Sequence, residues 1–200
     1  MNLGFDLDEV ISKTAHMAID YCNYELGTNA KVEDLNHFWF QKNIFTADEE
    51  KQKAMCSAMT WAVHSEDMLA TVKPYKNAVK CLNILNKSGH KIYIITKREH
   101  DFKDSTATWL CHNNIPFTKL VMTDGNEKGQ HIKKYKLDCY VDDCLPNLEE
   151  MAQAQLRWRK GLMVLTRPWN SWLNFNPDII TRVNTWQDII RNIEIGNRLK

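Results

Sequence analysis

Five short apolar runs, separated by stretches with helical periodicity, constrain the fold of this chain more than any other feature. The runs lie near residues 2–7, 91–96, 119–122, 138–142 and 161–165. Short apolar runs that alternate with helices are typical of a parallel β-sheet, because each crossover needs a helix to bring the chain back to the same edge. The sequence therefore predicts an α/β fold, a Rossmann-like doubly wound parallel sheet.

Helical periodicity fills most of the chain between these runs. The stretch 75–88 has apolar residues at helical spacing and is followed by Gly89, a residue type that commonly ends helices. Further helices are predicted over 102–113, 127–136, 146–156 and 184–195.

The segment 11–73 separates the first two predicted strands by an unusual distance. It is rich in Ala, Met, Lys and Glu and shows no strand pattern. A loop of that length without structure is uncommon inside a compact domain, so a helical insertion is expected. We predict a core domain made of residues 1–10 and 74–200, with residues 11–73 as a small helical cap inserted after the first strand.

Composition excludes several classes of protein. The chain has 200 residues, 44% of them hydrophobic, which is enough for a sizeable core and rules out fibrous and disordered proteins. The net charge of +1 creates no global field that would attract nucleic acid or an anionic membrane. Neither a signal-type N-terminus nor an apolar run of about 18 residues is found. We expect a cytoplasmic protein with no membrane and no nucleic acid among its partners.

Six cysteines are scattered without a Cys-x-x-Cys pair, and several lie in apolar stretches. They are expected to be reduced, buried thiols that act as small hydrophobic side chains. Cys139 and Cys144 flank an acidic pair, but no histidine pair at zinc spacing accompanies them, so a zinc site is not expected.

Two carboxylates, Asp6 and Asp8, follow the first apolar run two positions apart. Side chains at i and i+2 of a strand point the same way, so both can converge on one pocket beyond the carboxyl end of the strand. Burying two acids without a cation is unfavourable by several kcal/mol, which makes a metal ion the natural partner. The alternative is that the pair lies at an exposed strand end, where it caps a helix or faces water.

Two later strand ends carry groups that suit a phosphate site. The run 91–96 ends at Thr96, with Lys97 and Arg98 next, and the run 138–142 ends at the acid pair Asp142-Asp143. Lys128 begins the helix that precedes this second run. Each has an ordinary alternative: Thr96 as a β-branched strand residue, Lys128 as a solvated side chain, and Asp143 as a helix N-cap.

The order of these groups, acid-x-acid, Thr, Lys and acid-acid at successive strand ends, resembles the signature of the haloacid dehalogenase-like phosphatases. Asp6 to Val10 resemble motif one, Thr96 motif two, Lys128 motif three and Asp142-Asp143 motif four, and the helical insertion resembles a type-one cap. The Thr96-Lys97-Arg98 turn, Val141 to Asp143 and the stretch Leu165 to Asn170 are similar to the 5′(3′)-deoxyribonucleotidase-like family. Two positions depart from that pattern: Glu9 replaces the usual glycine, and Lys97 stands where the animal enzymes have a phosphate-contacting serine.

The resemblance implies a Mg²⁺-dependent phosphomonoester hydrolase that works through an aspartyl-phosphate. Asp6 would be the nucleophile, and Asp8 would protonate the leaving group, activate water and ligate Mg²⁺ through its main-chain carbonyl. Asp6, Asp142 and Asp143 would supply metal ligands, and the resemblance leaves open which of Asp142 and Asp143 binds the ion directly. Lys128 would offset negative charge, and Thr96 with Lys97 and Arg98 would bind the phosphate, the last two through their backbone amides.

The substrate is predicted from aromatic residues of the insertion. Consecutive residues on a helix are about 100° apart, so Phe38, Trp39 and Phe40 cannot all face one core. In the resembling nucleotidases cap aromatics stack on the base, so Phe38 and Trp39 are predicted to bind a nucleobase; packing in the core of the cap is the alternative.

The predicted substrate is therefore a nucleoside monophosphate. The alternatives are another small phosphorylated metabolite, a nucleic-acid end, or a catalytically silent binding relative. A phosphoreceiver is disfavoured, because receivers place their paired acids first and lack this insertion. Trp169, Trp172 and Phe175 are expected to pack over the sheet edge, or to form a homodimer surface.

Overall fold

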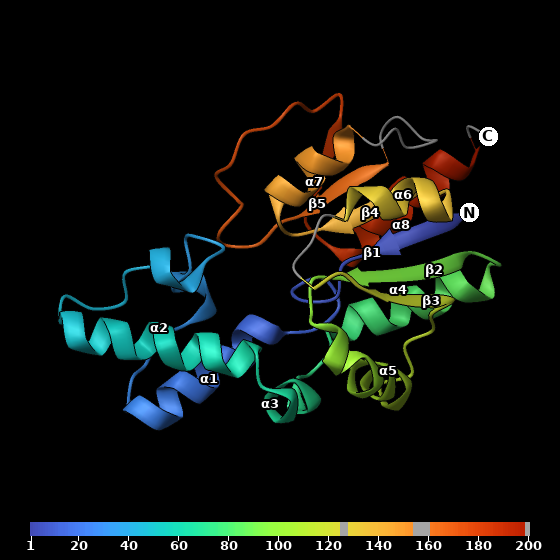
Figure 1. Ribbon diagram of the computed structural model, residues 1–200. Helices are drawn as coiled ribbons and strands as arrows, with labels where there is room; N and C mark the ends of the chain where they lie inside the picture. The colour runs from blue at the N-terminus through green and yellow to red at the C-terminus, as the bar shows by residue number, and fades with distance from the viewer. Residues whose placement is uncertain (125–127, 154–160, 199–200) are drawn as a thin grey trace.

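A six-stranded parallel sheet forms the centre of the molecule in the computed structural model, which describes residues 1–124, 128–153 and 161–198. The strand order is β3-β2-β1-β4-β5-β6 (Figure 1). The strands are β1 (Asn2–Phe5), β2 (Lys91–Thr96), β3 (Lys119–Met122), β4 (Cys139–Asp142), β5 (Leu162–Leu165) and β6 (Ile180–Val183). This arrangement confirms the α/β, Rossmann-like fold. The five predicted strands are present, whereas β6 was not predicted.

Helices cover both faces of the sheet, as the alternation of side chains requires. The helices α4 (Lys76–Lys87), α5 (Lys103–His112) and α8 (Trp186–Arg198) pack on the face that includes Leu3 and Phe5. The helices α6 (Gly129–Tyr135) and α7 (Leu145–Ala152) pack on the other face, over Ile95 and Tyr140. These helices agree with the predicted ones, except that residues 127 and 154–156 of the predicted ranges lie outside the described residues.

Gly4 allows β1 to lie close beneath Tyr140 of the neighbouring strand β4. A Cβ atom at Gly4 would meet the Tyr140 ring at 2.6 Å and the Leu137 side chain at 2.7 Å. The Tyr140 hydroxyl donates a hydrogen bond of 2.9 Å to the Ile95 carbonyl of β2. Tyr140 therefore spans three neighbouring strands, and a glycine in β1 makes room for it.

The segment between β1 and α4 is helical and lies to one side of the sheet (Figure 1). It contains α1 (Thr14–Leu26), α2 (Glu49–Val63), α3 (Glu66–Thr71) and two short 3₁₀ helices, η1 (Val32–Asp34) and η2 (Phe40–Lys42). The helices α1 and α2 pack against each other around a separate apolar cluster that includes Ile19 and Met59. Treating this segment as a cap, with boundaries at 11 and 73, stays a prediction.

The prediction that residues 38–40 lie on an α-helix was wrong. Phe38 and Trp39 lie in irregular backbone, and Phe40 begins the 3₁₀ helix η2. The buried Asn43 side chain replaces helical hydrogen bonds there, donating to the His37 and Trp39 carbonyls at 2.9 Å each. Because local hydrogen bonds from asparagine compete with helix formation, this stretch folds as a compact loop.

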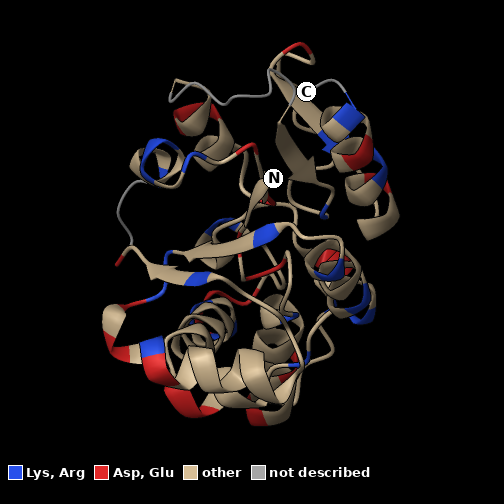
Figure 2. Cartoon of the chain, turned by 90° about the vertical axis from the view of Figure 1, so that its right-hand side faces the viewer, with Lys and Arg blue, Asp and Glu red and all other residues tan. Residues whose placement is uncertain are grey.

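The prediction of buried thiols is confirmed for most of the cysteines but was wrong for Cys111, which is exposed, and Cys56, which is half-buried. Four of the six cysteines, Cys22, Cys81, Cys139 and Cys144, are buried. Basic and acidic residues are mixed along the helices of the side seen in Figure 2. Every helix within the described residues is too short or too polar to span a bilayer.

Candidate active site

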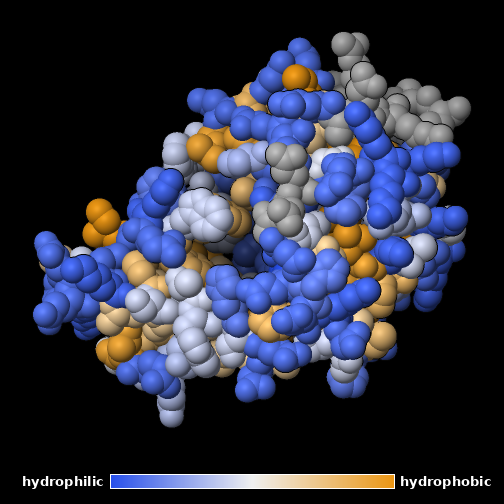
Figure 3. All heavy atoms as spheres, viewed as in Figure 1, coloured by the Kyte–Doolittle hydropathy of each residue, from blue (hydrophilic) through white to orange (hydrophobic). Residues whose placement is uncertain are grey.

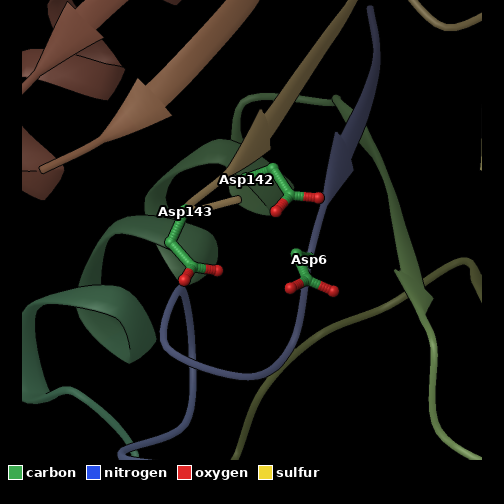
Figure 4. Close-up of side chains that lie close together, drawn as sticks. All are labelled: Asp6, Asp142 and Asp143. Carbon is green, nitrogen blue, oxygen red and sulfur yellow. The ribbon is translucent and has the colours of Figure 1, made fainter. Parts of the chain in front are cut away.

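Four of the predicted site residues meet at the carboxyl edge of the sheet because their strands are neighbours. Asp6 directly follows β1, Thr96 ends β2, Asp142 ends β4 and Asp143 comes next. The Asp6 amide donates to the Val141 carbonyl at 2.8 Å, which extends the pairing of β1 with β4 up to the acid. Figure 4 shows the carboxylates of Asp6, Asp142 and Asp143 turned toward a common point.

Three buried carboxylates and one lysine form the centre of this site. Carboxylate oxygens of Asp6, Asp142 and Asp143 lie within 4.8 Å of one another. Lys128, at the start of α6 and 1% exposed, places its Nζ 2.7 Å from Asp6 Oδ1 and 2.9 Å from Asp142 Oδ2. The alternative of a solvated Lys128 was therefore wrong.

Burial and mutual repulsion shift the pKa values of this cluster. Burial raises the pKa of Asp6 to about 7, with Asp142 and Asp8 adding to the rise and Lys128 opposing it. Burial and the neighbouring acids raise the pKa of Asp143 as well. Although burial opposes its charge, Asp142 and Asp6 hold the pKa of Lys128 well above its ordinary value. One ammonium group thus faces three acids, an imbalance that a divalent cation would correct.

The donor set fits a magnesium ion. Asp143 Oδ1 is buried and has no hydrogen-bond partner among the described residues, while Oδ2 accepts from Trp169 Nε1 at 2.9 Å. Asp142 is held by the Cys144 amide at 2.8 Å and by the Asn147 side chain. An unpartnered buried oxygen beside two further carboxylates is the ligand chemistry that Mg²⁺ prefers. Asp143 does not cap α7, whose N-cap is Cys144.

Asp8 lies beside this cluster and is paired with Arg98. Since β1 ends at Phe5, the argument that Asp6 and Asp8 share one face of a strand was wrong, although both line the same cavity. Arg98 donates from Nε to Asp8 Oδ2 at 3.0 Å and from Nη2 to Asp8 Oδ1 at 2.7 Å, and Thr14 and Ser12 also donate to Oδ1. Although burial opposes it, the Arg98 guanidinium lowers the pKa of Asp8 below its ordinary value.

The predicted phosphate-binding residues take three different positions. Thr96 is buried, and its Oγ1 lies 3.5 Å from Asp8 Oδ2 and accepts from the Arg98 amide at 3.3 Å. Lys97 is exposed at the edge of the cavity. Arg98 is buried, with its guanidinium group engaged by Asp8 rather than free for a ligand.

A cavity of about 410 Å³ joins this site to the helical insertion. Its lining includes Asp6, Asp8 and Lys128 at the sheet edge and Phe38 and Trp39 from the helical insertion. Figure 3 shows the surface hollowed between the two parts of the molecule. Phe38 is 42% and Trp39 is 59% exposed, and their ring centroids are 5.1 Å apart at nearly a right angle. The volume is that of a small-ligand site, and the two rings offer it an apolar wall.

Glu9, Tyr75 and Arg167 form a contiguous group that the sequence did not indicate, in which Glu9 is buried and the other two are half-buried. Glu9 has a positive φ of 60°, and its carboxylate accepts from the Ala15 amide at 2.6 Å and the Tyr75 hydroxyl at 2.8 Å. Burial raises the pKa of Glu9 to about 6. Arg167 stacks 4.4 Å from the Tyr75 ring centroid. A positive φ is a conformation that favours glycine, and Glu9, which departs from the glycine of the family pattern given above, was the available signal.

Comparison with known proteins identifies the family. The family model described as "5' nucleotidase, deoxy (Pyrimidine), cytosolic type C protein" matches residues 1–199. The chain belongs to this nucleotidase family. A nucleotidase from Clostridium acetobutylicum is 24% identical over 189 residues, covering 94% of this chain and 91% of the relative. A relative from Oceanobacillus iheyensis, also with a nucleotidase name, is 25% identical over 198 residues, covering 96% and 98%.

Solved structures agree with the fold. A HAD family hydrolase from Deinococcus radiodurans R1, with bound phosphate and sodium, has a TM-score of 0.67 at 11% identity, covering 98% of this chain and 96% of that one. A dehalogenase structure has a TM-score of 0.62 at 10% identity, covering 96% of each chain. This chain is thus a phosphatase of the nucleotidase family, and it has the haloacid dehalogenase-like fold.

Proposed function

We propose that this enzyme is a Mg²⁺-dependent 5′(3′)-(deoxy)ribonucleotidase that hydrolyses nucleoside monophosphates through an aspartyl-phosphate on Asp6. The observation that carries the proposal is the position of Asp6, buried against Lys128 and lining a cavity to which two aromatic side chains of the helical insertion also contribute. Phosphate chemistry and aromatic rings in one cavity suit a substrate with a phosphate and a base.

In the first half-reaction an Asp6 oxygen attacks phosphorus, and the bond from phosphorus to the ester oxygen breaks. Asp8 gives its proton to the departing alkoxide. Lys128 steadies the ionised Asp6, and Thr96 with the amides of residues 97 and 98 orients the phosphate. Asp6, Asp142, Asp143 and the Asp8 carbonyl would hold Mg²⁺, which would supply positive charge to offset the charge on the phosphoryl group.

In the second half-reaction Asp8 takes a proton from water, whose oxygen attacks the phosphorus of the aspartyl-phosphate. The bond to Asp6 breaks, inorganic phosphate leaves and Asp8 is protonated again. Asp8 thus alternates between acid and base.

The cavity wall supports a nucleobase as the group attached to the phosphate. Phe38 and Trp39 are exposed and line the same cavity as Asp6, and base stacking on aromatic rings contributes about 1–3 kcal/mol per base. A phosphatase of another small metabolite is the second candidate. It is supported by Lys97, an exposed cation at the cavity edge where the family pattern has a serine.

The test measures phosphate release from deoxyribonucleoside and ribonucleoside monophosphates and from sugar phosphates, with Mg²⁺ or EDTA. We expect turnover that needs Mg²⁺, favours nucleotides and falls by several orders of magnitude in Asp6→Asn while the circular dichroism spectrum is unchanged. Full activity of a folded Asp6→Asn protein would remove Asp6 as nucleophile. Equal turnover of sugar phosphates would favour the second candidate.

A further inference from the structure

The turn that follows β5, residues 167–170 (Arg-Pro-Trp-Asn), contacts both acidic segments of the active site. Arg167 donates to the Glu9 carbonyl from Nε at 2.8 Å and also from Nη2. Glu9 directly follows Asp8 in the sequence. Trp169 Nε1 donates to Asp143 Oδ2 at 2.9 Å. This turn therefore connects the loop after β1 with the loop after β4.

The turn is held rigidly at both of its ends. Asn170 is 1% exposed; its Nδ2 donates to the Asp143 carbonyl at 2.7 Å and to the Leu165 carbonyl at 2.9 Å. Its Oδ1 accepts from the Arg167 amide at 3.0 Å, which closes the turn on itself. Trp169 is 5% exposed, and its ring packs into the apolar cluster formed by α1 and α2. A side chain fixed by packing can fix the group that it hydrogen-bonds.

The hydrogen bond from Trp169 bears on the orientation of the Asp143 carboxylate. An indole has one N–H and no acceptor, so Trp169 can only donate, and it engages one of the two oxygens. The other oxygen, Oδ1, is left buried without a partner among the described residues, and the carboxylate faces Asp6 and Asp142 (Figure 4). Without the indole N–H, Asp143 Oδ2 would lose this donor. The Asp143 carboxylate would then be freer to rotate.

We propose that the turn 167–170 is a positioning element of the metal site, in which Trp169 orients Asp143 so that Oδ1 is presented to a divalent cation. This inference rests on the proposed function, which places Mg²⁺ among Asp6, Asp142 and Asp143. Loss of groups that orient metal ligands commonly lowers metal affinity about 10- to 100-fold. We expect an effect of that size from removal of the Trp169 N–H.

Trp169→Phe tests the proposal because it removes the N–H and keeps an aromatic ring. Mg²⁺ alone is titrated into the substrate-free protein by calorimetry. Trp172→Phe is the matched control: Trp172 lies in the same connection and donates from Nε1 to the Asn36 carbonyl at 3.3 Å, but it is 58% exposed and makes no bond to an acid. We expect the Mg²⁺ dissociation constant to rise about 10- to 100-fold in Trp169→Phe and to stay at the wild-type value in Trp172→Phe.

An unchanged Mg²⁺ dissociation constant in a folded Trp169→Phe protein would overturn the positioning role. An equal rise in both variants would also overturn it, because it would indicate a general loss of packing. If Trp169→Phe does not fold, site-specific replacement of Trp169 by 3-benzothienylalanine, which has sulfur in place of the N–H, answers the same question with the ring shape kept. Failure of the wild-type protein to bind Mg²⁺ would instead contradict the proposed function.

Discussion

Arg98 holds both carboxylate oxygens of Asp8, which ties the predicted acid and base to a permanent cation. Such a two-point pair keeps Asp8 ionised and oriented. An Asp8 that must carry a proton for the leaving group therefore needs this pair to loosen when the substrate phosphate enters. The geometry makes the Arg98 side chain a partner of Asp8, while phosphate binding by the Arg98 backbone amide stays a prediction.

Arg98→Lys keeps the charge and removes the two-point contact. We expect kcat for nucleoside monophosphates to fall about 10-fold or more, since a positioned general acid typically contributes 10²–10⁴-fold. We expect a smaller loss for p-nitrophenyl phosphate, whose leaving group needs little protonation. Steady-state kinetics with both substrates, with Asp8→Asn as the reference variant, make the comparison. Equal losses on the two substrates would place Arg98 at the phosphate instead.

Lys128 compensates two buried carboxylates, so its charge should matter for folding as well as for catalysis. Lys128→Met keeps the length of the side chain and removes the ammonium group. Breaking a buried ion pair costs about 3–5 kcal/mol, and we expect a loss of that size in the free energy of unfolding in EDTA. Mg²⁺ should recover part of it by supplying the missing positive charge.

Urea denaturation in EDTA and in Mg²⁺ measures both effects. Lys133→Met is the control, because Lys133 is exposed on the same helix α6. A loss as large in the Lys133 variant, or no loss in the Lys128 variant, would contradict the role of Lys128.

The sequence was sufficient to bring Asp6, Thr96, Lys128 and Asp142 together, because parallel strands end at one edge of a sheet. It could not supply the partners of these groups. The bond of Trp169 to Asp143 joins residues 26 positions apart, and Trp169 had been assigned to packing over the sheet edge. Such contacts depend on the path of a turn and on side-chain rotamers, which no residue pattern records.

The strands and helices that the sequence predicted correctly are those with long or continuous apolar patterns. The strand β6 was missed because Ile180-Thr181-Arg182-Val183 has two polar residues between its two apolar ones, which is neither a continuous apolar run nor an alternating pattern, and because it lies at the edge of the sheet. The loop 36–43 was misjudged because the composition of the segment 11–73, rich in Ala, Met, Lys and Glu and without a strand pattern, suggested helix throughout, whereas Asn43 stabilises a compact turn there.

The packing of β1 on β4 gives a prediction for Gly4. Gly4→Ala would push against Tyr140, which hydrogen-bonds β2 and lies 5.7 Å below the Lys128 ammonium group. Because extra volume in a packed core costs about 1–3 kcal/mol, we expect the free energy of unfolding to fall by that amount. Urea denaturation measures it.

Gly129→Ala serves as the comparison for Gly4→Ala. Its Cβ would meet the end of the flexible Glu150 side chain at 2.8 Å and the Glu150 carbonyl at an ordinary contact distance of 3.8 Å, and alanine favours the helix that begins there. We expect a smaller loss of stability than at Gly4. An equal loss in both variants would contradict the argument from Tyr140.

The molecule as a whole should couple metal binding to protonation, because its site buries more acids than bases. Burial raises the pKa of Asp6 from its ordinary value of 3.8 to about 7, so the metal-free folded protein holds a proton that the unfolded chain releases. The stability contributed by this proton is present below pH 3.8 and is lost as the pH rises toward 7. Asp143, whose pKa is raised in the same way, adds to the effect.

Mg²⁺ must displace these protons, so it should stabilise the protein more at high pH than at low pH. We expect the rise in Tm on adding Mg²⁺ to be clearly larger at about pH 7.5 than at about pH 5.5, since binding at 100 times the dissociation constant contributes about 2.7 kcal/mol when no proton competes. His16 and His131, whose pKa values burial lowers, shift stability in the opposite direction. Their contribution is the same with and without Mg²⁺ and cancels in the difference. A Tm rise that is equal at both pH values would show that the acids are already ionised in the metal-free protein, and that Lys128 alone compensates them.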